Sequence, residues 1–302
     1  MSKTILHIGF PKTATTWFQQ TFYPNIKNVC FLSRDFVFDN IVFQDIFSFN
    51  HQEIKNKIEQ ISGDNRVVIC DEIFLGGLDI GFGNGEFFDL MAKRLYLLFP
   101  DAEIVFFIRN QHAALESAYS HYIMSGGTYS AKRYLGIKRL YRKPFMGYHL
   151  FNPKVYEYDK VIGTYVTLYG VDKVHIYLFE EFEKDPSEFI KHYCEDLQID
   201  LNEKISPNRL NKRLSSISLQ KQRFLNRFTL GNTPYKQYFF NIPRLYKFSR
   251  SLTKYIDSFC SLPKFQFSKD IHNWIEKRFK ESNQNLSTWI DADRLKHWGY
   301  PF

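Results

Sequence analysis

Residues 3–17 read KTILHIGFPKTATTW, and this stretch decides the fold. Residues 5–8 have the length and apolar character of a short buried strand, and a helix is expected to open at Trp17. The turn between them holds a glycine, a proline, a lysine and four small or hydroxylated residues: Gly9, Pro11, Lys12, Thr13, Ala14, Thr15 and Thr16. Small side chains let backbone N–H groups approach an anion, and a helix N-terminus and a lysine both add positive charge. The stretch therefore predicts a strand, an anion-binding loop and a helix.

A second candidate anion-binding element lies about 95 residues further along the chain. The apolar run 104–108 has the length of a strand buried on both faces, and Arg109 follows it. A helix is expected from Gln111 to about Ser125, and Ser117 lies eight residues after Arg109. A guanidinium at the C-terminal edge of a strand can hold a phosphate through two hydrogen bonds, and a hydroxyl on the following helix supplies another donor. Taken alone, an arginine at such a position is usually a solvated or ion-paired charge.

The two elements together resemble sulfotransferases that use 3′-phosphoadenosine 5′-phosphosulfate (PAPS), in particular the bacterial carbohydrate type. The order Pro11-Lys12-Thr13-Ala14-Thr15-Thr16-Trp17 is similar to their 5′-phosphosulfate loop, Pro-Lys-(Thr/Ser)-Gly-Thr-Thr. Arg109 and Ser117 match the arginine and serine that bind the 3′-phosphate in that family. The similarity covers roughly residues 1–200, with a weaker one that runs from Glu281-Ser282-Asn283 through Leu295 to Trp298-Gly299-Tyr300.

One residue of the loop departs from the family pattern. Ala14 stands where the family usually has glycine, and alanine disfavours a positive φ. The loop is therefore expected to be preserved if Ala14 has an ordinary helical or bridge conformation. If it does not, affinity for the donor is in question.

Strands and helices alternate along the first 200 residues, which predicts an α/β fold with a doubly wound parallel sheet. The resemblance implies the P-loop NTPase-like version of this fold, in which ligands bind at the C-terminal ends of the strands. We interpret residues 1–302 as one domain, with an α/β core over 1–200 and a basic, mainly helical extension over 201–302 that forms part of the acceptor site. Residues 126–154, rich in Tyr, Lys, Arg, Gly and Pro, are expected to be a long irregular insertion.

The resemblance implies transfer of a sulfuryl group from PAPS to a hydroxyl or amine, most simply of a carbohydrate or glycolipid, without a metal. Lys12 is the candidate that meets the negative charge growing on the leaving oxygen. The loop would hold the 5′-phosphate. Glu72, just after the apolar strand 66–70, is the first candidate for the general base that takes the proton of the acceptor. Asp71, His112 and His121 remain alternatives, and Asp71 and Glu72 can also be read as caps of the following loop.

Composition is consistent with a compact enzyme, since 44% of the 302 residues are hydrophobic and 18% are aromatic. The apolar runs are too short to span a membrane, and a first strand at residue 4 leaves no room for a signal peptide. The cysteines lie far apart, with no Cys-x-x-Cys spacing: Cys30, Cys70, Cys194 and Cys260. This pattern is typical of thiols in a reducing compartment, so a cytoplasmic location is expected.

The positive charge is concentrated in one segment. Between Arg209 and Ile256 there are eleven Lys or Arg and no Asp or Glu, against a net charge of +8 for the whole chain. Interleaved aromatic residues favour a lid that binds saccharide or nucleotide rings, or a surface that touches anionic lipid head groups at the inner membrane face. A helical subdomain with a solvated basic face is the plainer interpretation. We expect residues 126–154 and 209–256 to form the acceptor wall together, because neither has an evident scaffold role in the sheet.

Two other functions are compatible with parts of the sequence. A nucleotide-dependent kinase would also need an anion-binding loop, but a Walker A loop ends in G-K-[ST], whereas here Lys12 precedes the small residues and no G-K-[ST] occurs. An obvious magnesium carboxylate is also missing. A nucleic-acid-binding module would explain the basic and aromatic segment; the resemblance to sulfotransferases implies no nucleic-acid partner.

Overall fold

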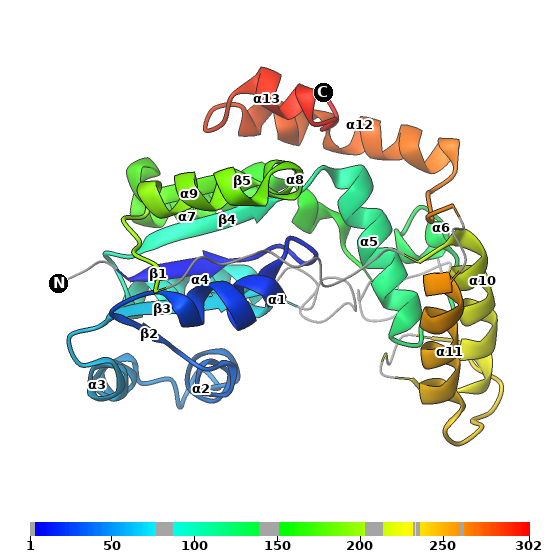
Figure 1. The fold of residues 1–302 in the computed structure, drawn as a ribbon, viewed down its shortest axis with the longest axis horizontal. Coiled ribbons are helices and arrows are strands. Elements are labelled where there is room, and N and C mark those ends of the chain that lie inside the picture. The colour runs from blue at the N-terminus through cyan, green and yellow to red at the C-terminus, as the bar shows by residue number, and fades with distance from the viewer. Residues whose placement is uncertain are drawn as a thin grey trace.

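The chain folds around one parallel sheet with helices on both faces (Figure 1). The computed structural model describes residues 4–76, 87–138, 151–202, 214–231, 233, 236–259 and 263–302. Five parallel strands lie in the order β2-β3-β1-β4-β5. Their bounds are β1 Ile5–Ile8, β2 Val29–Phe31, β3 Arg66–Asp71, β4 Glu103–Ile108 and β5 Val174–Leu178. The chain starts in the middle of the sheet and winds outward in both directions, which confirms the predicted doubly wound α/β fold.

Helical segments fill the connections. The α-helices are α1 Thr15–Trp17, α2 Arg34–Val37, α3 His51–Ser62, α4 Phe87–Leu98, α5 Gln111–Met124, α6 Ala131–Tyr134, α7 Tyr158–Tyr169, α8 Phe179–Lys184, α9 Pro186–Asp196, α10 Ser216–Leu225, α11 Leu245–Phe259, α12 Lys269–Leu286 and α13 Ala292–His297. The short 3-10 and π turns are η1 Phe18–Phe22, η2 Tyr23–Asn25, η3 Phe38–Val42, η4 Glu72–Leu75, η5 Pro153–Tyr156, η6 Val171–Lys173 and η7 Asn226–Phe228. The first helix begins at Thr15, two residues before the predicted Trp17, and continues through η1 and η2 to Asn25.

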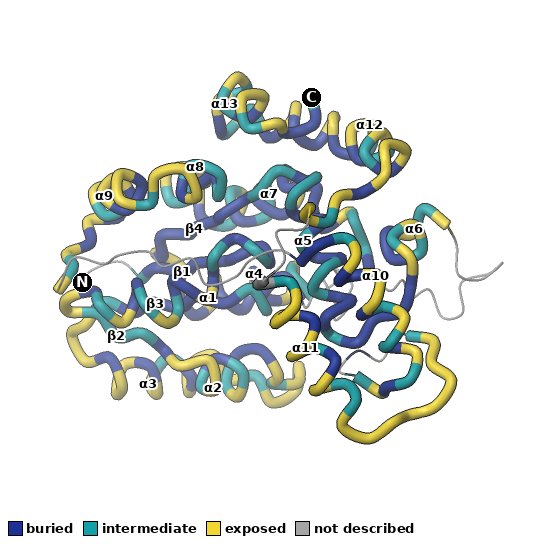
Figure 2. The backbone as a smooth tube through the Cα atoms, turned by 45° about the vertical axis from the view of Figure 1, so that its right-hand side comes forward, coloured by how far each residue is buried: buried dark blue, intermediate teal, exposed yellow. Residues whose placement is uncertain are grey.

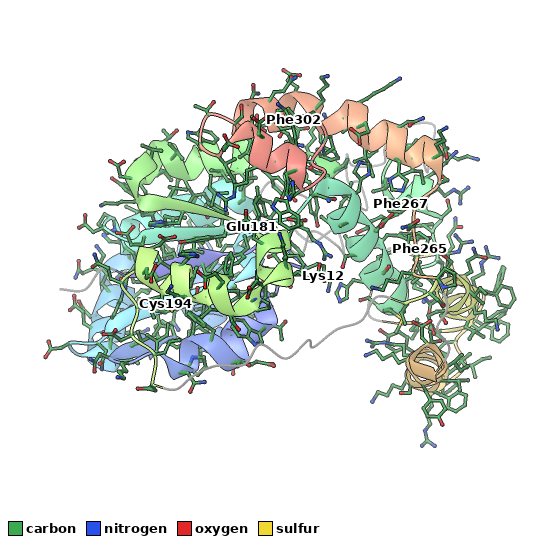
Figure 3. The ribbon with its side chains drawn as sticks, turned by 45° about the horizontal axis from the view of Figure 1, so that its top comes forward. Lys12, Glu181, Cys194, Phe265, Phe267 and Phe302 are labelled. Carbon is green, nitrogen blue, oxygen red and sulfur yellow. The ribbon has the colours of Figure 1, made fainter. Side chains whose placement is uncertain are left out.

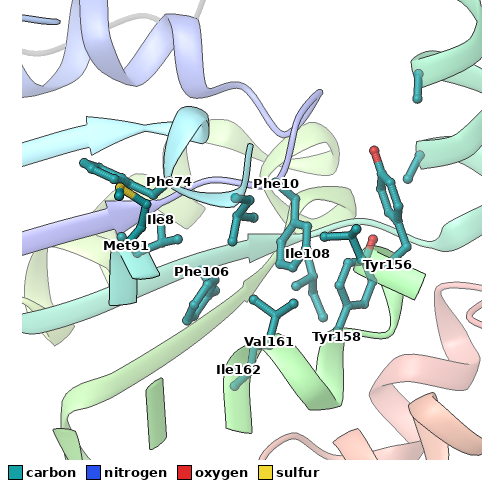
Figure 4. Packing of buried hydrophobic residues seen from close by; sticks show 14 of the residues in the cluster. Ile8, Phe10, Phe74, Met91, Phe106, Ile108, Tyr156, Tyr158, Val161 and Ile162 are labelled. Carbon is teal, nitrogen blue, oxygen red and sulfur yellow. The ribbon is translucent and has the colours of Figure 1, made fainter. Parts of the chain in front are cut away.

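Alternate residues of the central strands enter two hydrophobic clusters, one on each face of the sheet. On one face, Val105 and Phe107 of β4 pack with side chains of α1, η1, α8 and α9. On the other face, Phe106 and Ile108 pack with side chains of α4, of α7 and of η5, the turn before α7. Figure 4 shows this cluster, with Met91 of α4, Val161 of α7 and Phe10, which follows β1, among the labelled residues. Burial on both faces explains why the strands are continuous apolar runs in the sequence.

His7 belongs to this core. It is fully buried in β1, its Nδ1 lies 2.9 Å from the Tyr23 hydroxyl, and its ring stacks on Phe107 with 5.0 Å between centroids. Burial lowers the pKa of His7 to about 3, so the ring is neutral in the folded protein. Its role is packing.

The C-terminal helices extend the core along one side. Helices α10 and α11 form a hairpin at the end of the molecule opposite the N-terminus, attached to the C-terminal half of α5 (Figure 1). Helix α12 runs back over α5 and α7, and Arg294 of α13 pairs with Glu181 of α8. Gln111, at the start of α5, and Asn283 of α12 exchange two amide hydrogen bonds of 2.8 and 3.1 Å in a fully buried position. A buried amide pair that satisfies itself fixes α12 against α5 at one register.

The expectation that residues 126–154 lack a scaffold role is wrong for the parts that the structure describes. The fully buried ring of Tyr134, on α6, lies between Tyr122 and Phe151, with centroids 4.8 and 4.6 Å away. The tyrosine content of this segment suggested a ligand-binding surface. Tyr134 is instead a core residue of the hydrophobic cluster. Residues 139–150 of this segment lie outside the described residues, as do Arg209 and Cys260.

Candidate functional site

The loop between β1 and α1 has the backbone of an anion-binding nest. Lys12 and Ala14 have left-handed conformations, with φ of 70° and 68°, on either side of Thr13, whose φ is negative. Alternation of this kind turns successive backbone N–H groups toward one concave point. The Thr13 hydroxyl is buried and donates to the carbonyl of Phe10 at 2.6 Å, which fastens the loop from below. The turns at Lys12 and Ala14 are compatible with the anion-binding loop that the sequence predicts, and the Thr13 hydroxyl is already engaged within the loop.

The loop was expected to be preserved if Ala14 has an ordinary helical or bridge conformation, and Ala14 has neither. Its φ of 68° and ψ of 15° are left-handed, and it is the N-cap of α1. For an L-residue with a Cβ this conformation costs roughly 1–2 kcal/mol, whereas glycine adopts it freely. The chain thus carries backbone strain at the position where the resembling loops have glycine.

Ala14→Gly is expected to raise the free energy of unfolding by about 1 kcal/mol, because relief of the strain exceeds the added flexibility of the unfolded chain. Urea denaturation of the two proteins measures this difference. Ala113→Gly is the matched control, since Ala113 lies inside α5, where glycine is expected to destabilise by about 1 kcal/mol. If both substitutions destabilise alike, the left-handed conformation of Ala14 is not a source of strain.

The two threonines at the start of the helix differ in their surroundings. The Thr15 hydroxyl is buried and has no hydrogen-bond partner among the described residues. It lies against Gly9, where an added Cβ would be only 2.7 Å from its oxygen, so a side chain at position 9 would displace it. Thr16 is exposed. An unpartnered buried hydroxyl beside a nest is a donor that a bound anion can use.

Arg109 joins the second predicted element to this loop. It follows the last residue of β4, and its Nη1 donates to the carbonyl of Lys12 at 3.1 Å. Its Cζ lies 4.5 Å from the ring centroid of Phe179, and the hydroxyl of Tyr158 donates to its carbonyl at 2.5 Å. The guanidinium thus lies between the loop and the Phe179 ring, at the C-terminal ends of the strands, where Figure 3 also places Lys12.

Ser117 lies two turns into α5 and is half-buried, in one helical row with Ala113 and His121, which are also half-buried. The opposite side of α5 is packed into the core. This row is therefore the less covered side of the helix that begins two residues after Arg109.

The two acidic residues after β3 have different roles. Asp71 lies beside Ile8 in the sheet, is 1% exposed, and its carboxylate accepts from Arg34 Nε at 3.0 Å and from the Ile73 N–H at 2.9 Å. Burial raises the pKa of Asp71, although these two partners oppose the shift. Asp71 thus caps the following turn, the plainer of the interpretations the sequence offers. Glu72 opens that turn, η4, and is half-buried at the same edge of the sheet as the loop.

His112, one alternative for the general base, is engaged elsewhere. Its Nδ1 lies 2.7 Å from Nδ1 of His272, and its Nε2 lies 2.7 Å from a carboxylate oxygen of Glu276, both on α12. Glu116, one turn along α5, faces the other nitrogen of His272 at 3.4 Å. These four side chains connect α5 to α12. Of the two histidines considered for the general base, His121 is the one that shares a helical row with Ser117 on α5.

Sequence reasoning missed the residues that support the Arg109 turn. Glu180, just after β5, accepts from the N–H of Asn110 at 2.9 Å and from the hydroxyl of Tyr300 at 3.2 Å. The side chain of Asn110 donates to the carbonyl of Trp298 at 2.9 Å. Burial raises the pKa of Glu180. The Trp298-Gly299-Tyr300 segment, whose similarity to the sulfotransferase family is weak, thus holds in place the turn that carries Arg109. The position of Glu180 at a strand end was the one available signal.

Among the described residues, no group of three or more His, Cys, Asp or Glu side chains could hold a metal ion. Within the same part of the chain, none of the helices has the length and apolar composition needed to cross a bilayer. Cys30, Cys70 and Cys194 are free thiols.

Comparison with known proteins identifies the fold. No family model and no curated protein sequence matches the chain. Among solved structures, a sulfotransferase from Alicyclobacillus acidocaldarius superposes with a TM-score of 0.58 at 15% identity, over 99% of each chain. The mouse sulfotransferase SULT7A1, solved in complex with PAP, gives a TM-score of 0.47 at 14% identity over 98% of this chain and 89% of its own. The chain has the α/β, P-loop-like fold of sulfotransferases.

Proposed function

We propose that the protein transfers a sulfuryl group from PAPS to a hydroxyl or amine of an acceptor, most simply a saccharide or glycolipid. The observation that carries this proposal is the hydrogen bond between Arg109 and the carbonyl of Lys12. It brings the Pro-Lys-Thr-Ala-Thr-Thr loop and the Arg-x7-Ser element to one end of the sheet, although they are far apart in sequence. Two anion sites at one sheet edge suit a donor with phosphates on both the 5′ and 3′ positions of its ribose.

The proposed donor contacts follow from the geometry of the loop. Pro11, Trp17 and the backbone of Thr13 and Ala14 would shape the nest around the 5′-phosphate, with hydroxyl donors from Thr15 and Thr16. Arg109 and Ser117 would hold the 3′-phosphate. The unpartnered Thr15 hydroxyl and the nest at Lys12 and Ala14 support this fit.

The proposed chemistry is an in-line displacement at sulfur. The acceptor oxygen or nitrogen forms a bond to sulfur while the bond from sulfur to the bridging oxygen breaks, and the electron pair remains on that oxygen. Lys12 would stabilise the charge on the departing 3′,5′-adenosine bisphosphate. The carboxylate of Glu72 would take the acceptor proton. Neither step uses a metal.

A kinase is not favoured, because the loop places Lys12 before the small residues and within a left-handed turn, unlike a Walker A lysine at the start of a helix. A cytoplasmic location, at the inner face of the membrane, belongs to the same proposal and rests on the free thiols and on the basic segment. Thermal melting distinguishes the two enzyme classes, because a sulfotransferase is stabilised by 3′,5′-adenosine bisphosphate and a kinase by ATP with magnesium.

Arg109→Ala is expected to weaken the binding of 3′,5′-adenosine bisphosphate by roughly 1.5–3 kcal/mol, the range of a charge-assisted hydrogen bond. Calorimetric titration measures this loss. Because Arg109 also touches the loop, 5′-AMP is the control ligand, and its affinity is expected to change much less since it has no 3′-phosphate. Equal losses for both nucleotides would assign Arg109 to the loop and not to the 3′-phosphate.

A further inference from the structure

The hairpin of α10 and α11 has its polar residues inside. Gln222 of α10 is fully buried, and its side-chain amide donates to Asn226 at 2.8 Å and to the Ser249 hydroxyl at 3.1 Å. The Thr253 hydroxyl donates to the side-chain oxygen of Gln222, Oε1, at 2.8 Å. Asn226 donates to the carbonyls of Ile123 and Gly127 at 2.7 and 2.8 Å. Hydrogen bonds thus hold α11 to α10 and fasten the hairpin to the C-terminal end of α5, beside Leu219 of α10, which is buried in the core.

Many apolar side chains of α11 and of the connection before it are exposed instead. On α11, Phe248 and Tyr255 are 66% and 63% exposed, and Leu252 and Ile256 are exposed beside them at helical spacing. The connection between the helices adds exposed Tyr238, Phe239, Phe240 and Ile242, and α10 adds Phe224. Figure 2 shows this connection as an exposed loop beyond the ends of both helices. Helices of water-soluble proteins normally place the apolar stripe against the core, and exposed apolar patches of this kind mark interaction surfaces.

Basic residues border the apolar stripe. Lys247 and Lys254 are exposed along the neighbouring side of α11, Arg244 is exposed just before that helix, and Lys221 and Arg227 are exposed on the α10 arm. Asp257, the acidic residue of this stretch, is turned inward and accepts from the Ser215 N–H at 3.0 Å. The outer surface of the hairpin, which we call the hairpin face, is therefore apolar, aromatic and positively charged.

We propose that the hairpin face docks onto an anionic lipid bilayer, with Phe239, Phe240 and Phe248 among the head groups and the basic row against lipid phosphates. Aromatic and aliphatic side chains gain from the boundary between head groups and acyl chains, and Lys or Arg near an anionic surface contributes about 1 kcal/mol each. A second copy of the chain would bring like charges together. A nucleic acid would match the charge but leave Leu252 and Ile256 in water. Of these three occupants, the bilayer is the one that matches both the charge and the apolar surface.

This docking goes beyond the proposed transfer reaction and does not depend on it. If the docking and the transfer reaction both hold, the bilayer lies at the C-terminal end of α5, the helix that carries Ser117. An acceptor anchored in the lipid then fits this arrangement.

Vesicle sedimentation tests the docking. We expect the protein to sediment with phosphatidylcholine vesicles that contain about 30% phosphatidylglycerol, and not with phosphatidylcholine alone, because the face is both charged and apolar. The triple substitution F239S/F240S/F248S is expected to lower binding at least tenfold, a loss of about 1.4 kcal/mol or more. The matched control is I46S/F47S, which removes two side chains that are 73% and 97% exposed away from the hairpin.

The charge is tested separately with K247E/K254E, which is expected to weaken binding at low salt and much less at about 0.5 M salt. Sedimentation that is absent, or equal with neutral and anionic vesicles, overturns the proposal. So does sedimentation velocity that finds a dimer lost in F239S/F240S/F248S while vesicles are not bound, since the face would then join two copies. Affinity for 3′,5′-adenosine bisphosphate in solution is expected to be unchanged in these variants, so failure here is separate from failure of the donor site.

Discussion

Lys12→Ala is expected to lower kcat for sulfuryl transfer by roughly 10²–10³, the loss found when a preorganised donor to a developing oxyanion is removed. The affinity for 3′,5′-adenosine bisphosphate should fall much less, because Arg109 and the nest remain. Release of the bisphosphate from PAPS under saturating donor and acceptor measures kcat, and calorimetry measures the affinity.

Lys12→Arg is the matched control for this substitution. It keeps the charge and the long side chain, so it should retain more activity than alanine while facing the same left-handed backbone at position 12. A kcat for Lys12→Ala within a few-fold of the parent would remove Lys12 from the reaction and leave it as a loop residue only.

Glu72→Gln is expected to reduce kcat by about 10² or more while donor binding is retained, because glutamine has nearly the same shape but cannot accept the acceptor proton. Asp71→Asn is the neighbouring comparison. Since Asp71 is buried and paired with Arg34, its substitution should lower the free energy of unfolding more than it affects the rate at saturating substrate.

His121 offers the competing position for the base, on the half-buried row of α5 with Ser117. A large loss in His121→Ala together with normal turnover in Glu72→Gln would move the base to that helix. His112→Ala should instead weaken the attachment of α12, because both ring nitrogens face residues of that helix.

The parts of the fold that the sequence predicted are local ones. Short apolar runs such as 104–108 predict strands because both faces of the sheet are covered by helices. The small residues of the loop predict an anion site because such a site requires a close approach of the backbone. The fold class and the position of Arg109 at a strand end are confirmed. The roles of Lys12, Glu72, Arg109 and Ser117 in binding and catalysis stay predictions.

The parts that the sequence did not predict depend on contacts between distant segments. Ala14 is left-handed because the chain must turn from β1 into α1 while Thr13 is fastened to Phe10, and nothing in the residue type announces this. Composition cannot distinguish Tyr134, a core residue, from an exposed ligand-binding tyrosine. Arg223, which the charge pattern groups with the acceptor wall, instead lies half-buried with its guanidinium 3.4 Å from the hydroxyl of Tyr119. The charge test of the basic segment therefore uses Lys247 and Lys254 of α11.

The most direct test of the account is to incubate the protein with sulfur-labelled PAPS and separate pools of saccharides, glycolipids, phenols and peptides. We expect label to pass to the saccharide or glycolipid pool with the parent protein and not with Lys12→Ala. If the label stays in the donor with every pool, and 3′,5′-adenosine bisphosphate fails to raise the melting temperature while ATP raises it, the proposed sulfuryl transfer is contradicted.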